Sequence, residues 1–71
     1  MAVLRTRMYE YRKKLGIQQQ ELADRVGARR ETIGKLENGK YNPSLKLAMD
    51  IARELGTTVE ELFVFEEDLE D

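Results

Sequence analysis

The sequence contains no cysteine and no histidine, and it has a single serine, Ser44. Without cysteine there is no disulfide framework, and without either residue the usual zinc sites lose their ligands. Catalytic triads likewise lose their histidine base. An active site would have to rest on Asp, Glu or Lys, and no constellation of these residues supports one. We therefore expect no metal, no cofactor and no enzymatic activity.

Long apolar runs are also missing. No stretch approaches the roughly 18 apolar residues that span a bilayer. The opening "MAVLRTRMYE" lacks the apolar segment of a signal peptide. These absences favour a soluble cytoplasmic protein with no membrane partner. At 71 residues we expect one domain, whose small core stabilises so little that an oligomer is also expected.

Charge is distributed unevenly along the chain. Residues 1–59 hold all 12 Lys and Arg and seven acids, a net charge of +5. Residues 60–71 hold the other seven acids and no base, a net charge of −7. This asymmetry indicates a polyanion as a partner for the cationic body. Taken alone, however, it is more often an ordinary solvated surface.

Hydrophobic spacing predicts a chain of short helices. Gln18 and Glu21 are placed to form a capping box, with Ile17 and Leu22 as a hydrophobic staple. The inner face of the fourth helix is expected to consist of Leu45, Ala48, Ile51, Ala52 and Leu55. The helices are expected at about 4–15, 19–26 and 30–37, from Pro43 or Ser44 to before Gly56, and from Thr57 or Thr58 onward. The segment "LFVFEED" alternates apolar residues with others, which predicts a short strand. A strand needs a partner, and "MAVL" is the only apolar candidate left.

The stretch "VGARRETIGKLENGK" carries the strongest functional signal. Two short helices joined by "GAR" are typical of a helix-turn-helix. At about 100° per residue, Glu31, Gly34 and Lys35 lie opposite the apolar side of the second helix, with Arg30 on the flank. Arg, Glu and Lys can read base edges in the major groove. Alternatively, Glu31 and Lys35 form an ion pair on a solvated face, and Gly34 is merely tolerated at a cost of about 1 kcal/mol.

Residues 17–63, "IQQQELADRVGARRETIGKLENGKYNPSLKLAMDIARELGTTVEELF", resemble the Cro/phage-repressor (XRE-type) helix-turn-helix family. They match without gaps a pattern beginning L-S-Q-x-E-L-A and ending L-G-V-S-x-x-E-L-F. The whole chain is similar to small stand-alone members of the cytolysin-repressor type. The resemblance implies an all-α, five-helix lambda-repressor-like DNA-binding domain. A small two-stranded antiparallel sheet, formed by the N- and C-terminal segments, completes this fold.

The resemblance also implies roles for matching residues. Base reading is expected from Arg30, Glu31 and Lys35. Arg12 and Glu37 match a pair that holds the first and third helices together. Contacts to the DNA backbone are expected from Gln19, Arg29, Asn38, Gly39 and Lys40. The sequence departs from the family at Gln18 and Arg29, where serine is usual, and at Glu31 and Gly34, where glutamine and serine are frequent.

The chain ends are expected to form the dimer. "LFVFEED" would pair with "MAVL", and a two-fold interface would involve Val59, Leu62, Phe63 and Phe65. The acids from Glu66 to Asp71 would keep the sheet edge soluble and point away from DNA.

Together these features predict one domain over 1–71, with its helix-turn-helix at about 19–37 and a C-terminal strand and acidic tail at 63–71. The protein is predicted to be a transcriptional regulator that binds double-stranded DNA sequence-specifically. It would be a repressor that binds a two-fold symmetric operator as a homodimer. The alternative is an antitoxin or adaptor-type protein-interaction module that uses the same fold.

Overall fold

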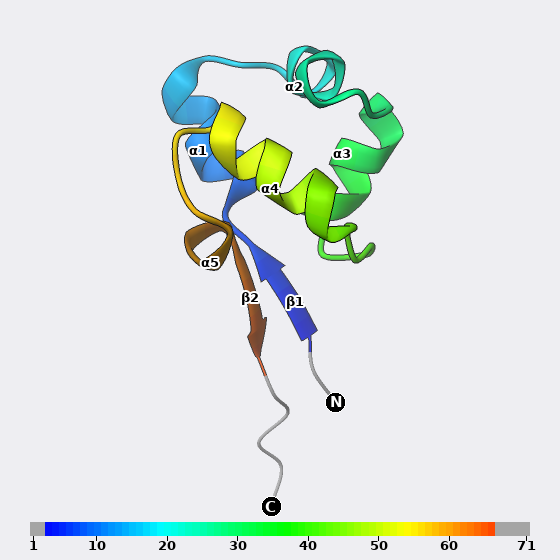
Figure 1. Cartoon of the computed structure of the whole chain (residues 1–71), viewed down its shortest axis with the longest axis vertical. Coiled ribbons are helices and arrows are strands. Elements are labelled where there is room, and N and C mark those ends of the chain that lie inside the picture. Colours follow the sequence, from blue (N-terminus) through cyan, green and yellow to red (C-terminus); the bar gives the residue numbers. More distant parts are fainter. Residues whose placement is uncertain (1–2, 67–71) are drawn as a thin grey trace, which may run out of the picture.

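The computed structural model describes residues 3–66 (Figure 1). One strand precedes the five helices and a second strand follows them, and the two strands form a small sheet, as the sequence predicts. In chain order the elements are β1 (Val3–Thr6), α1 (Met8–Leu15), α2 (Gln19–Val26), α3 (Arg30–Glu37), α4 (Leu45–Glu54), α5 (Val59–Leu62) and β2 (Phe63–Glu66).

The sheet joins the two ends of the described chain. β1 and β2 are antiparallel, with Leu4 opposite Phe65 and Thr6 opposite Phe63. Figure 1 shows the pair extending away from the helices. The expected strand pairing is therefore confirmed over these residues, whereas Met1 and Ala2 of "MAVL" and the acidic tail from Glu67 to Asp71 lie outside the described part of the chain. The first helix is shorter than predicted, because the backbone of residues 3–6 is used by the sheet and α1 begins only at Met8.

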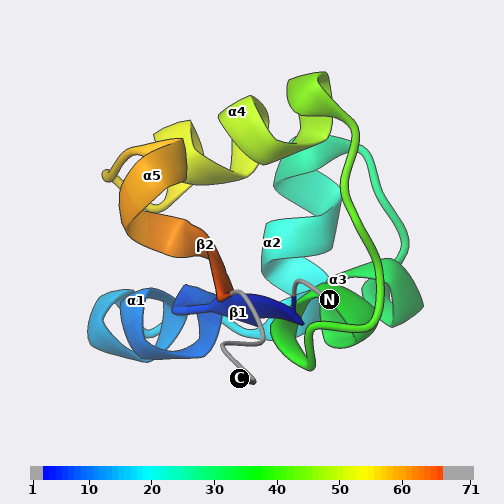
Figure 2. The ribbon, with the colours of Figure 1, turned by 90° about the horizontal axis from the view of Figure 1, so that it is seen from below.

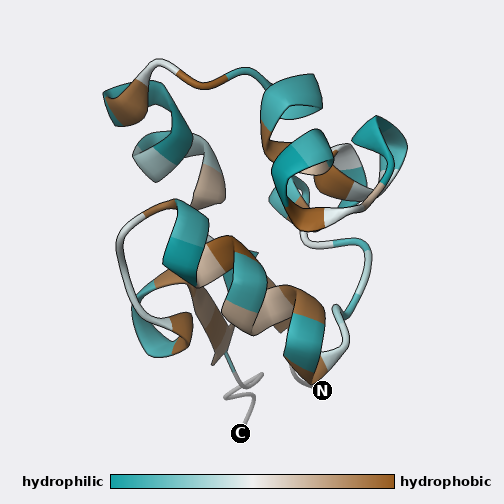
Figure 3. Ribbon diagram, turned by 45° about the horizontal axis from the view of Figure 1, so that its top comes forward, coloured by the Kyte–Doolittle hydropathy of each residue, from teal (hydrophilic) through white to brown (hydrophobic). Residues whose placement is uncertain are grey.

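The core lies where the five helices meet. Brown and teal segments alternate along the helices in Figure 3, as expected of amphipathic helices with one apolar side. Ile17 and Leu22, the predicted staple, belong to the same buried cluster. Its members are Met8, Ile17, Leu22, Ala23, Ile33, Leu36, Ile51, Ala52, Leu55 and Leu62. Leu45 does not belong to it: at the first position of α4 this side chain is 73% exposed, so the predicted inner face begins at Ala48.

Helix starts differ in how they are capped. The Ser44 hydroxyl accepts a hydrogen bond from the Leu47 amide at the start of α4, and Thr58 caps α5 in the same way. Neither Gln18 before α2 nor Arg29 before α3 makes a side-chain cap. The predicted capping box is therefore wrong. The Glu21 carboxylate instead accepts from Arg25, one turn later, at 2.7 Å.

Candidate nucleic-acid interface

The geometry of the site begins with how α3 is held. Ile33 and Leu36 are completely buried on its inner side, and α2 packs against it. Because these two residues fix the rotation of the helix, Arg30, Glu31 and Lys35 are left exposed on the outside. Figure 2 shows α1 and α3 along one edge of the molecule and α4 and α5 along the opposite edge.

A buried ion pair fixes the far end of α3 to α1. Arg12 Nε lies 2.7 Å from Glu37 Oε2, and Arg12 Nη2 donates to Glu37 Oε1 at 3.2 Å. The third donor, Nη1, reaches the Ile17 carbonyl at 2.9 Å. Only 10% of the Arg12 side chain and 7% of the Glu37 side chain are exposed. The two charges are thus desolvated but fully hydrogen-bonded, the arrangement in which a buried pair is tolerated.

Gln19 extends this pair to the exposed face of α3. Its Nε2 donates to Glu37 Oε1 at 3.0 Å, and its Oε1 accepts from Arg30 Nη1 at 3.3 Å. A continuous chain of hydrogen bonds therefore connects the buried Arg12 to the exposed Arg30. The sequence indicated Gln19 only as a backbone contact. No sequence signal pointed to its bond with Glu37, since the two residues are 18 positions apart.

Glu31 and Lys35 are on the same outer face but do not pair. Within residues 3–66, neither side chain takes part in a salt bridge or a hydrogen bond, although both are exposed. The alternative in which they neutralise each other across one helical turn is therefore not the arrangement found. Both side chains are free to contact a partner.

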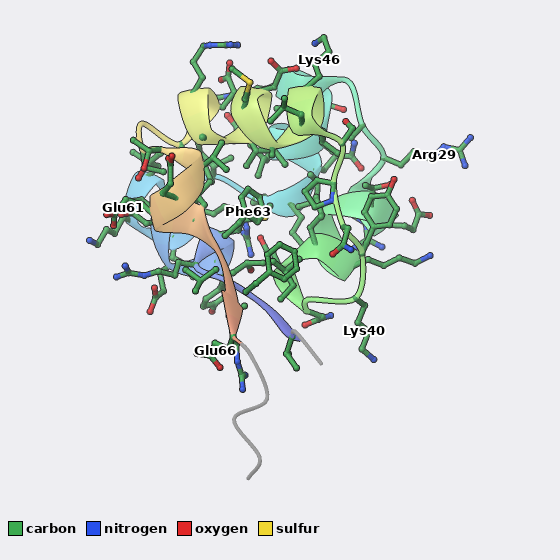
Figure 4. All side chains as sticks on the ribbon, turned by 60° about the horizontal axis from the view of Figure 1, so that its bottom comes forward. Arg29, Lys40, Lys46, Glu61, Phe63 and Glu66 are labelled. Atoms are coloured by element: carbon green, nitrogen blue, oxygen red, sulfur yellow. The ribbon has the colours of Figure 1, made fainter. Side chains whose placement is uncertain are left out.

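The two helices of the helix-turn-helix begin without a side-chain cap, as α1 also does, whereas α4 and α5 are capped. The first amides of such a helix have no partner within it, and the helix dipole adds positive potential there. Arg29, directly before α3, adds a full positive charge. Figure 4 shows Arg29 and Lys40 projecting outward on one side of the molecule, with Glu61 on the opposite side. The uncapped ends thus favour an anion.

The loop after α3 contributes side chains but not amides. The amides of Asn38, Gly39 and Lys40 donate to carbonyls of α3 at 3.2, 3.0 and 2.9 Å. Gly39 has a positive φ of 70°, and a Cβ on it would lie 2.5 Å from the Leu4 carbonyl oxygen. The fold therefore requires glycine at position 39. For a partner, the loop offers the exposed Asn38 and Lys40 side chains.

The predicted dimer residues separate into two groups. Val59, Phe63 and Phe65 line an apolar groove of about 310 Å³ between the sheet and α4. The groove is completed by Leu4, Asn42, Pro43, Leu45 and Ala48. Leu62 requires a correction: it is completely buried in the core of its own chain, because α5 turns it away from the groove.

Residues 3–66 hold no group of three or more His, Cys, Asp or Glu side chains that could bind a metal ion. None of the helices in this part of the chain could span a lipid bilayer.

Residues 8–62 match a family model described as "Helix-turn-helix". The chain is 57% identical over 65 residues to an uncharacterised HTH-type transcriptional regulator of Archaeoglobus fulgidus. The aligned region covers 92% of this chain and 92% of that protein. Among solved structures it is similar to the restriction-modification controller protein C.AhdI from Aeromonas hydrophila, with 33% identity, a TM-score of 0.71 and coverage of 78% of this chain and 83% of that one. It is also similar to SinR, a master regulator for biofilm formation crystallised with DNA, with 28% identity, a TM-score of 0.68 and coverage of 75% and 86%.

Proposed function

The chain belongs to the helix-turn-helix family of transcriptional regulators, and we propose that it is a repressor that binds a two-fold symmetric DNA operator as a homodimer. The observation that carries this proposal is the outer face of α3. It presents Arg30, Glu31 and Lys35 while a buried ion pair fixes the helix to the body. The similar SinR was crystallised with DNA, which supports the same partner here.

In this proposal the outer face of α3 enters the major groove. A helix docked there reads bases mainly with its N-terminal residues. Arg30 would donate to guanine O6 and N7, and Glu31 would accept from the amino group of cytosine. Lys35, one turn further along, would reach a guanine. Gln19 keeps the Arg30 guanidinium in place before DNA arrives, which lowers the entropy lost on binding.

The DNA backbone would be held by the groups around this helix. Arg29 and Lys40 supply positive charge, and Asn38 supplies an amide side chain. The uncapped start of α2 at Gln19 offers free amides to a phosphate. The role of Gly39 in this proposal is conformational, since its own amide already bonds to α3. These contacts give affinity and register but carry no sequence information.

Dimerisation would use the apolar groove. One recognition helix contacts few bases, and two of them must lie about 34 Å apart to enter successive major grooves on one side of the duplex. The groove is rich in apolar side chains, and Leu45 and Phe65 at its border are 73% and 55% exposed. A second copy that covers them would remove this apolar area from water.

The dimer can be tested with matched surface variants. Leu45→Glu places a charge at the border of the groove without touching the core, so sedimentation at micromolar concentration should give a monomer. Met49→Glu is the control, because this residue is also exposed on α4 but does not line the groove. A wild-type protein that sediments as a monomer would overturn the homodimer.

DNA recognition can be tested by selection from random double-stranded DNA. The wild-type protein should enrich one sequence with two-fold symmetry. Enrichment of a single unsymmetrical half-site would contradict the symmetric operator, and no enrichment at all would contradict sequence-specific binding. Reduced expression of a reporter placed behind the selected site would support repression, whereas increased expression would indicate activation.

A further inference from the structure

Gly34 lies in the middle of α3, one turn after Arg30, and nothing in its backbone requires glycine. The other four glycines, Gly16, Gly27, Gly39 and Gly56, all have φ close to +70°, where side chains are strongly disfavoured. Gly34 has no positive φ and belongs to a regular helix. Any residue could adopt this conformation, and alanine would favour the helix more.

Packing does not require glycine at this position either. A Cβ built on Gly34 would have one neighbour within 4 Å, the Gln19 Oε1 atom at 3.9 Å. That distance is an ordinary van der Waals contact. At Gly39, by contrast, a Cβ would collide with backbone at 2.5 Å. The chain's own structure thus explains Gly39 but leaves Gly34 as a bare patch on an otherwise side-chain-covered helix.

The chemistry of this patch restricts what can fill it. The Gly34 carbonyl accepts from the Asn38 amide at 3.2 Å, and its own amide lies within the regular hydrogen-bond ladder of the helix. The patch therefore presents Cα–H surface and no free donor or acceptor. Of the groups that base pairs display in the major groove, the C5-methyl of thymine is the apolar group that projects from the base edge, whereas cytosine has only a hydrogen at that position.

We propose that the bare backbone at Gly34 receives a thymine methyl group, which makes Gly34 a determinant of base preference. This inference rests on the proposed function, because it requires α3 to lie in the major groove. Arg30, on the same side of the helix and held by Gln19, would then read a base close to this thymine.

The first test compares Gly34→Ala with the wild-type protein. The added methyl should raise the melting temperature by roughly 4–8 °C, which is the shift expected when a helical glycine is replaced in a chain of this size. The same variant should bind the selected DNA site about tenfold more weakly, because the added methyl occupies the space of the thymine methyl, and such a loss is within the range of one mismatched base pair. A variant that is less stable, or that binds the site as tightly as the wild-type protein, would overturn the inference.

The second test restores the space on the DNA side. Deoxyuridine lacks only the methyl group of thymidine, so it is placed at each thymine of the selected site in turn. At one position the affinities of Gly34→Ala and the wild-type protein should converge to within about twofold. Convergence at no position would overturn the assignment to thymine.

The two tests also separate this inference from the proposed function. A wild-type protein that selects no DNA sequence would overturn both. If the wild-type protein selects a site that Gly34→Ala binds equally well, only the inference is overturned.

Discussion

Replacing Arg12 by methionine tests the structural basis of the site. The substitution preserves most of the side-chain length but removes three hydrogen-bond donors, two that contact Glu37 and one that contacts the Ile17 carbonyl. It leaves the Glu37 carboxylate, with 7% of its side chain exposed, without its countercharge. Breaking such a buried pair costs about 3–5 kcal/mol. For a domain of this size that corresponds to a fall in melting temperature of at least roughly 12 °C.

Circular dichroism during heating and urea titration would measure this loss, with Arg5→Met as the matched control. Arg5 also contacts a glutamate, Glu66, at 2.9 Å, but 66% and 57% of these side chains are exposed. Exposed pairs contribute only about 0–1 kcal/mol. If Arg12→Met costs no more than Arg5→Met, the ion pair does not hold α3 to the body and the reasoning is refuted.

A double variant, Arg12→Met with Glu37→Met, separates stability from function. Replacing both charges by apolar groups should recover much of the stability lost by the single variant, because no unpaired charge stays buried. DNA preference should not recover, since Gln19 loses the Glu37 oxygen that orients it toward Arg30. Full recovery of sequence preference would contradict the role given to this hydrogen-bond chain.

Three further predictions concern charge. Arg29→Ala and Lys40→Ala should each weaken binding to all DNA sequences and reduce the slope of log affinity against log salt by about 0.9 in titrations at several salt concentrations. Glu31→Gln should raise affinity for random DNA, because the amide is not repelled by phosphates. It should also change the preferred base at one position, because the amide can pair with adenine. Selection from random DNA with this variant measures the preferred base, and an unchanged preference would contradict base reading by Glu31. A hydrogen bond from Lys46 and a second from Arg53 lower the pKa of the Asp50 carboxyl below its usual value. The stability this provides is present above the unfolded-state pKa and lost as pH falls through the folded-state pKa, so melting curves of Lys46→Ala should show a shallower decline in acid than those of the wild-type protein.

Local patterns in the sequence were sufficient for the helix-turn-helix itself. α2 and α3 begin and end at the residues that spacing and glycine predicted, because their apolar periodicity and their boundaries agree. The antiparallel pairing of the chain ends was also predictable. Only two short apolar segments were left unassigned, and a strand cannot be stable alone.

The remaining errors arise from tertiary contacts. Leu4 fits a helical spacing with Met8, but pairing with β2 places it in a strand. Leu45 was expected in the core but is exposed, and Leu62 was expected in the dimer interface but is buried in the core. Helix spacing alone does not say where α4 starts relative to the core or how α5 is rotated. The bond between Gln19 and Glu37 depends on two helices meeting at one point, which no local pattern encodes.

Arg30→Ala tests most directly whether the outer face of α3 reads bases. Its affinity would be measured by titration against the selected site and against random DNA at the same salt concentration. We expect a loss of about 1–3 kcal/mol on the selected site, which is roughly 5- to 150-fold, and little loss on random DNA. An equal loss on both DNAs would mean that Arg30 contacts only phosphate, and it would contradict base reading by this helix.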